Sequence, residues 1–335
     1  MTFVVLYIIS CMTKHSTDLA ILSIGRLTGG IATSILYSSF ESWMISEHFN
    51  RNNFPSDWIR DTFYIQTLLN GIVAILAGFV SNFLYNFFDK SAVVTFDAAI
   101  IFLMIGGIMI LTSWEENYGD RSGDVQKNFS EGWRVMRSDT RVLCVAISQS
   151  FFEAAMYIFV LMWTPTLKAA VDVDVELDIG NIFAAFMIAV MIGSAIFRII
   201  CSSDEGEDKD KKYQIWRTPE YVLMGVFAIA FLSLVTPIIS SSFNVLLFGF
   251  LVFECCVGLF WPAISTIKSA YIPEEVRSTV MNYIRIPTNF LVVVSLFYVD
   301  VIPQFQVCCF LLLGSLISQI MIVKKLSTTS KQELP

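Results

Sequence analysis

The chain of 335 residues is 55% hydrophobic and only 15% charged, whereas charged residues make up about 25% of an average soluble domain. A chain this apolar cannot keep its hydrophobic surface from water by folding on itself. The composition therefore predicts a polytopic membrane protein that uses lipid as part of its solvent. The net charge of −7 and the lack of a dense basic stripe argue against nucleic-acid binding.

Apolar runs follow one another along the whole chain, and a helix needs about 20 such residues to cross a hydrocarbon layer of about 30 Å. We expect ten spans, the first of them short, at residues 2–13, 19–45, 62–85, 91–113, 142–167, 180–201, 219–239, 243–264, 280–300 and 303–323. The expected fold is an all-α bundle of about ten transmembrane helices.

The longest polar stretch lies between the fourth and fifth expected spans. It predicts an N-terminal half bundle, a linker, a C-terminal half bundle and a tail, at residues 1–113, 114–141, 142–323 and 324–335. A charge run at 202–217 and an acidic stretch at 168–179 are expected to be solvated loops, although the acidic stretch also fits a vestibule that attracts cations.

Basic residues predict the orientation. With the N-terminus placed inside, Lys14, Lys90 and Lys168 fall outside and Arg26 falls within a span, whereas all the other Lys and Arg residues fall inside or at inner span ends. Short cytoplasmic loops carry the excess of Lys and Arg, so this split places both termini in the cytoplasm.

Four charged side chains stand out among those within the expected spans, where a charge costs about 2.5–3.5 kcal/mol on insertion scales unless it faces water or a partner. Glu153 and Glu254 are each expected about 16 Å deep, near the middle of the bilayer. We favour a role in a substrate or proton pathway for both over carboxyls that lock two helices together. Arg26 is a candidate for ligand contact or interhelical pairing, and Arg285 for ligand contact or snorkelling to the inner interface.

Four more residues are candidates for coupling or gating. Glu41 ends the second span near the cytoplasm, where we expect it to pair with a base from an inner loop. Arg198 lies near the inner end of its span, and snorkelling is the favoured interpretation. Pro262 and Pro287 lie within spans and free backbone carbonyls, so kinks there serve either gating or static packing.

Enzyme signatures are missing from the sequence. It contains no G-x-S-x-G, no Walker loop, no H-E-x-x-H and no His/Cys set with metal spacing. We therefore expect no enzymatic activity, no cofactor and no metal. The inner stretch is too short for a nucleotide-binding domain, which favours a secondary carrier over an ATP-driven pump.

Two features resemble a known superfamily. The run Gly25 to Gly30 places an arginine before spaced glycines, and four plus six spans flank a long inner loop. Both resemble the major facilitator superfamily, whose pattern is six plus six spans. By this resemblance the first span here corresponds to the family's third, and two spans of the family pattern are missing in front of it.

Longer segments are similar to the molybdate-anion transporters within that superfamily. They are Gly25 to His48, Trp114 to Tyr118, Phe151 to Pro165, Gly193 to Ile199, Phe253 to Ser265 and Asn282 to Asn289. The resemblance implies uptake of molybdate, a tetrahedral dianion, across the cell membrane. The implied partners are membrane lipid and this small anionic solute.

An oxyanion near the middle of the bilayer needs hydrogen-bond donors, and a guanidinium group offers several with a permanent charge. We expect Arg26 to be the first such donor and Arg285 the second. Protonation of Glu153 and Glu254 would remove charges that repel a dianion and would couple the site to protons. The alternatives are a carrier for an organic cation, a sugar or a drug, and a membrane protein that does not transport.

Overall fold

The computed structural model describes residues 1–56, 58–88, 91–115, 125–172, 177–201, 217–298 and 303–332. Regular structure in these residues is helical. The charge run at 202–216, residues 173–176 of the acidic stretch with two of its four acidic side chains, and part of the expected linker at 116–124 lie outside the described residues.

Four long or medium helices form the N-terminal half, namely α1 (Thr2–Met12), α2 (Leu19–Ser46), α3 (Trp58–Phe87) and α4 (Val93–Ser113). Helix α1 packs against both α2 and α4. Small residues permit this approach, because Gly25 and Gly29 face the side chains of Thr13 and Ser10, and the Ser10 hydroxyl donates to the Gly25 carbonyl at 2.7 Å.

The C-terminal half contains the other helices, namely α6 (Thr140–Ala169), α7 (Ile179–Cys201), α9 (Pro219–Ile239), α10 (Phe243–Tyr271), α11 (Glu274–Phe297) and α12 (Gln304–Gln332). Its core is aromatic. Fully buried rings of Phe152, Phe159, Phe253 and Phe260 join α6 to α10, with the Phe152 and Phe260 centroids 4.1 Å apart. Such rings stabilise a helix interface through both contact area and ring geometry.

Helices α7 and α10 approach each other most closely. A side chain on Gly193 would meet the Cys255 carbonyl oxygen at 2.0 Å, and one on Gly258 would meet the Val190 carbonyl oxygen at 1.9 Å. At each of these glycines, the backbone of one helix therefore lies directly against the backbone of the other. This is the close packing that small residues provide between membrane helices, where lipid gives no hydrophobic drive for association.

Each of the ten expected spans corresponds to a helix. Within the described part of the chain, eight helices are long and apolar enough to cross a membrane by length and composition. The helix at Thr2–His15 is shorter, as expected for the first span. Helix α11 is of spanning length but is not among the eight, and it carries Glu274, Glu275, Arg277 and Arg285.

The expected linker contains a helix of its own. Helix α5 (Val125–Ser138) is amphipathic and packs on α11, where Gly132 faces Thr279 and the Tyr283 hydroxyl donates to the Phe129 carbonyl at 2.9 Å. From sequence this segment was expected only to be a polar stretch. Its apolar residues recur with a helical period, but the segment is too short and too polar to stand out as a span.

The cap of α6 leads to a prediction about pH. The Asp139 carboxylate accepts from the Arg141 backbone N–H at 2.8 Å and pairs with the Arg141 guanidinium at 2.8 Å. The Arg141 hydrogen bond lowers the pKa of Asp139. A lowered pKa adds stability above the ordinary Asp pKa of about 3.9, and this stability is lost as the pH falls through the folded-state value.

We therefore expect Asp139→Ala to destabilise the folded chain by about 0.5–2 kcal/mol at pH 7. The difference from the unaltered chain should shrink at acidic pH. Thermal unfolding in detergent at pH 7 and near pH 3 measures both, with Ser138→Ala as the neighbouring control. A destabilisation that is equal at the two pH values would contradict the charged cap.

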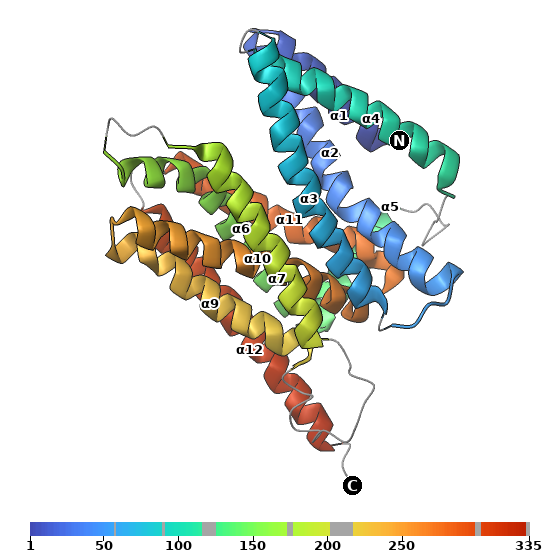
Figure 1. The fold of residues 1–335 in the computed structure, drawn as a ribbon. Coiled ribbons are helices and arrows are strands. Elements are labelled where there is room, and N and C mark those ends of the chain that lie inside the picture. Colours follow the sequence, from blue (N-terminus) through green and yellow to red (C-terminus); the bar gives the residue numbers. More distant parts are fainter. Residues whose placement is uncertain are drawn as a thin grey trace.

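The two halves meet through α2 and α3 (Figure 1). Helix α2 packs against α11, and α3 packs against α7 and α10. Among the described residues, the side-chain contacts between the halves fall on the second part of α2 and the first part of α3, from Ser34 to Gly71. We call the side of the molecule where α2 ends and α3 begins the inner side, and the helix ends on that side the inner ends. The halves are therefore joined at their inner ends.

Candidate functional site

A buried ion pair lies where the halves meet. Arg285 on α11 and Glu153 on α6 place Nη2 and Oε2 3.8 Å apart, with residue exposures of 8% and 1%. At about 1.5 Å per residue, Glu153 lies about 20 Å along α6 and Arg285 about 17 Å along α11 from their inner ends. Both charges are therefore near the middle of the membrane-spanning region.

The other half of the molecule also contacts Arg285. The Tyr37 ring on α2 lies 3.9 Å below the Arg285 guanidinium carbon, and it stacks on the Trp261 ring of α10 at 6.3 Å between centroids. A cation over an aromatic face is attracted by the ring quadrupole, more so where water is scarce. We call Tyr37, Gln149, Glu153, Trp261 and Arg285 the central cluster.

Hydrogen bonding in the central cluster is incomplete. Gln149 donates to Glu153 Oε1 at 2.6 Å, while Glu153 Oε2 is buried and accepts no hydrogen bond within the described part of the chain. Among the described residues we find no hydrogen bond from the Arg285 guanidinium. The pair is longer than a charge-assisted hydrogen bond of 2.7–2.9 Å. Arg285 thus keeps its position through charge and ring contacts while its donors stay available to an acceptor.

Arg26 and Glu254 are not part of this cluster. Arg26 is exposed, and the described part of the chain offers it no ion pair. It is about three helical turns from Tyr37, hence on the same face of α2 and about 16 Å towards the outer end. Glu254 is 6% exposed and shares a face of α10 with Trp261, about 10 Å further out. Both residues therefore lie outward of the cluster along their helices, in a region that we call the outer approach.

The inner ends are held together by polar contacts, which we call the inner contact. The Glu41 carboxylate on α2 pairs with Lys268 on α10 at 3.0 Å, so the expected base is found, although on a helix and not in a loop. Asn50 hydrogen-bonds to Glu274 beside it. These contacts join the two halves on the inner side of the central cluster.

Arg198, for which snorkelling to the inner membrane interface was the favoured interpretation, contacts two side chains of α3. Its Nε lies 3.1 Å from Asp61 Oδ1 on α3, and its guanidinium covers the Tyr64 ring at 5.1 Å. Both partners of this pair are about half exposed, and exposed pairs contribute about 0–1 kcal/mol. The pair thus links the halves weakly.

We expect Arg198→Ala and Asp61→Ala to change the free energy of unfolding by less than about 1 kcal/mol each. A double-mutant cycle of thermal unfolding measures the coupling between the two side chains. A coupling well above that range would mean that the pair is a main link of the inner contact.

The two prolines flank the site. Pro262 is buried next to Trp261 on α10, and Pro287 follows Arg285 closely on α11. Each interrupts the helix ladder beside a residue of the central cluster. Kinks at these two prolines that serve gating or static packing stay a prediction.

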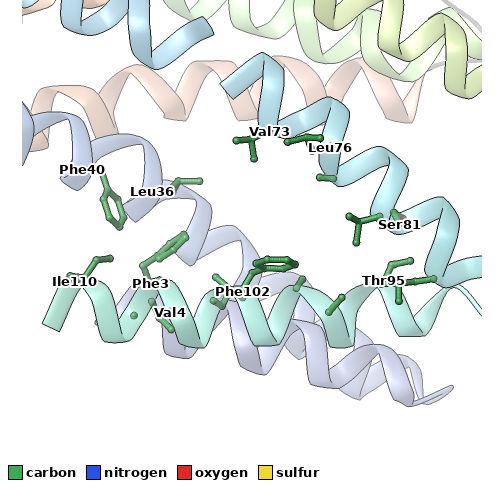
Figure 2. A pocket seen from close by; sticks show the side chains of 18 residues that line it. Phe3, Val4, Leu36, Phe40, Val73, Leu76, Ser81, Thr95, Phe102 and Ile110 are labelled. Carbon is green, nitrogen blue, oxygen red and sulfur yellow. The ribbon is translucent and has the colours of Figure 1, made fainter. Parts of the chain in front are cut away.

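A cavity in the N-terminal half lies apart from the central cluster and differs from it in character (Figure 2). It measures about 780 Å³ and is enclosed by α1, α2, α3 and α4. Its lining is almost wholly apolar, with rings of Phe3, Phe40 and Phe102 and only the hydroxyls of Ser81 and Thr95. It offers no charge to an ionic solute, so the central cluster remains the candidate site.

Several members of the site were missed by the sequence analysis. Gln149, Lys268 and Asp61 lie outside every motif named above. Tyr37 and Trp261 lie in segments that resemble the family but were not singled out there. Spacing gave a partial signal, since Gln149 is one helical turn from Glu153 and Tyr37 shares a helix face with Arg26. The pairing of residues from opposite halves had no signal, because it depends on tertiary packing.

A family model now places the chain. The model, of the major facilitator superfamily and described as sugar transporters with 12 transmembrane segments, matches residues 1–257. The chain belongs to this major facilitator family. It is accordingly a multi-pass membrane protein, and the family is one of carriers and not of enzymes.

Named relatives of this major facilitator chain are similar over most of its length. The molybdate-anion transporter of Takifugu rubripes is 30% identical over 326 residues, which is 88% of this chain and 64% of the relative. That of Xenopus tropicalis is 31% identical over 294 residues, 86% of this chain and 62% of the relative. The chain therefore spans a little under two thirds of the length of these curated relatives.

A solved structure supports the fold. The crystal structure of the E. coli fucose:proton symporter matches with a TM-score of 0.65 at 13% identity, covering 96% of this chain and 82% of that chain. At this identity the match concerns the fold alone. It agrees with the expected major-facilitator-like, all-helical bundle.

Proposed function

We propose that this chain is a secondary transporter that carries molybdate into the cell by alternating access. The observation that carries the proposal is Arg285, a buried guanidinium between the two halves whose donors make no hydrogen bond to the residues that the structure describes. The similarity to molybdate-anion transporters supports an oxyanion as the solute that uses them.

The placement of contacts supports alternating access. The inner contact closes one end, and the outer approach with Arg26 and Glu254 leads to the central cluster from the other. We propose that the half bundles at 1–113 and 142–323 rock about this cluster. Breaking the inner contact would then open the path to the cytoplasm.

Glu153 gives the cluster a group that can take up and release a proton as the anion binds and leaves. An arriving oxyanion competes with the Glu153 carboxylate for Arg285, and two like charges this close cannot both stay ionised at low cost. We propose that Glu153 takes a proton when the anion binds and returns it when the anion leaves. Uptake should then carry protons with the anion.

The orientation and location belong to the same proposal. The excess of Lys and Arg at the inner ends supports cytoplasmic termini, with the linker at 114–141 and the tail at 324–335 on that side. The similarity to the named relatives supports the cell membrane as the site of action.

Uptake of labelled molybdate by cells that express the chain tests the proposal. Tungstate, which has the same shape and charge, should compete strongly, sulfate less so, and sugars or amines not at all. Vector-only cells provide the control. Uptake equal to that control in correctly folded, membrane-inserted protein would contradict molybdate transport.

A sugar carrier is the second candidate, and the description of the family model favours it. The aromatic faces of Tyr37 and Trp261 suit a sugar ring, whereas a buried guanidinium without hydrogen bonds suits an anion better. Competition by hexoses, with no competition by tungstate, would decide for the sugar.

A further inference from the structure

Two buried cations lie at the inner ends of α10 and α11, below the central cluster. Lys268 is 2% exposed, and its Nζ lies 3.0 Å and 3.1 Å from the two carboxylate oxygens of Glu41. Arg277 is 5% exposed and donates from Nη2 to the carbonyls of Ser269 and Ile272 at 3.3 Å and 3.0 Å. The guanidinium therefore touches the residue that follows Lys268.

Arg277 has donors to spare. Its Nε and Nη1 are buried and have no hydrogen-bond partner among the described residues. Glu41, Glu274 and Glu275 lie within electrostatic range of it. A buried donor without an acceptor is unfavourable, and a charged one more so. The site is thus built to hold more negative oxygen atoms than the closed arrangement supplies.

The counter-charge that faces both cations comes from the other half. Lys268 and Arg277 belong to the C-terminal half, whereas Glu41 belongs to α2 of the N-terminal half. When the halves separate at their inner ends, Glu41 leaves with α2. Lys268 then loses the carboxylate that pairs with it, and Arg277 loses one of the three carboxylates near it, because Glu274 and Glu275 stay on α11. A buried charge left without its partner is strongly unfavourable.

We propose that Lys268 and Arg277 form an inner oxyanion site, which the Glu41 carboxylate fills while the inner end is closed and the transported anion fills once it opens. This inference rests on the proposed function. Arg277 and Arg285 are about two turns apart on α11, or about 12 Å along its axis, so an anion released by Arg285 reaches this site in one short step. Glu41 thus holds the place of the solute.

Exchanging the two charges distinguishes an anion-binding role of Lys268 from a role only in the ion pair that holds the inner ends together. The variant E41K/K268E keeps an ion pair across the inner contact but moves the cation to α2. We expect its uptake of molybdate to stay below a tenth of the unaltered rate, although its thermal stability returns towards that of the unaltered chain. Uptake restored to within twofold would overturn the proposal, because Lys268 would then serve only to close the inner end.

Equilibrium binding to the purified chain in detergent tests the site without transport. The isosteric variant Glu41→Gln should bind two molybdate ions per chain, and Glu41→Gln/Lys268→Gln, which leaves no unpaired carboxylate, should bind one. Arg285→Gln in the Glu41→Gln background should remove the other ion. A single ion bound by Glu41→Gln, unaffected by the Lys268 change, would overturn the inner site and leave the proposed function intact.

Failure of the proposed function gives a different result. It would appear as no molybdate uptake and no molybdate binding by the unaltered chain. Sulfate and inorganic phosphate in the same binding assay then decide the inner site: binding by Glu41→Gln that Lys268→Gln removes supports it, and no binding of either anion overturns it.

Discussion

Replacing Arg285 by glutamine should lower molybdate uptake by about 100-fold. Two charge-assisted hydrogen bonds at about 1.5 kcal/mol each amount to about 3 kcal/mol, which corresponds to that factor in affinity. Glutamine keeps much of the volume and some hydrogen-bonding capacity but removes the charge. Initial uptake rates at a molybdate concentration below saturation measure the loss.

Controls must separate binding from folding, because Arg285→Gln leaves Glu153 buried without its cation. Loss of one partner of a buried pair costs about 3–5 kcal/mol of stability. Glu153→Gln/Arg285→Gln removes both charges and should recover stability without recovering uptake. Arg285→Lys keeps the charge but not the planar fork over Tyr37, and we expect partial activity. Uptake within threefold of the unaltered rate in the glutamine variant would exclude Arg285 as the anion donor.

Replacing Gly258 by alanine should destabilise the C-terminal half by about 1–3 kcal/mol or more. The added methyl group would lie 1.9 Å from the Val190 carbonyl oxygen and 2.9 Å from its Cα. These atoms are backbone, so no rotamer change relieves the clash and α7 must move away from α10. Thermal unfolding in detergent and the fraction of monodisperse protein measure the effect.

Gly225→Ala provides the matched control, because Gly225 lies within α9 and, outside its chain neighbours and the adjacent backbone of its own helix, no atom of a described residue lies within 4 Å of an added Cβ. Alanine has the higher helix propensity, by about 1 kcal/mol in a helix interior. This variant should therefore be as stable as the unaltered chain or more so. Equal stability for the two alanine variants would mean that α7 and α10 do not depend on the glycine contact.

The order of the helices and their approximate number were predictable from sequence, because long apolar runs have few alternatives to helix in a bilayer. The inner ends were less so. Helix α10 continues to Tyr271 and α11 begins at Glu274, so Lys268 and Arg277 lie in helices beyond the apolar runs. The apolar run that marks a span ends where polar residues begin, whereas the helix itself continues as long as its backbone hydrogen bonds are satisfied.

The candidate site was predictable by residue type and only partly by arrangement. The cost of burying charge singled out Glu153 and Arg285, and the structure brings them together. The same reasoning placed Arg26 first, yet Arg26 is exposed on the outer approach. Depth along a helix can be counted from the sequence, but which helices face each other across the two halves depends on packing, and that decides the partners.

The Tyr37–Trp261 stack joins the halves through two nearly parallel rings, with 14° between their planes. An indole's emission depends on what its face touches, so separating the halves should change the fluorescence of Trp261. A chain that keeps this tryptophan and replaces the other six by phenylalanine would therefore report its own opening and closing in real time, without any attached dye.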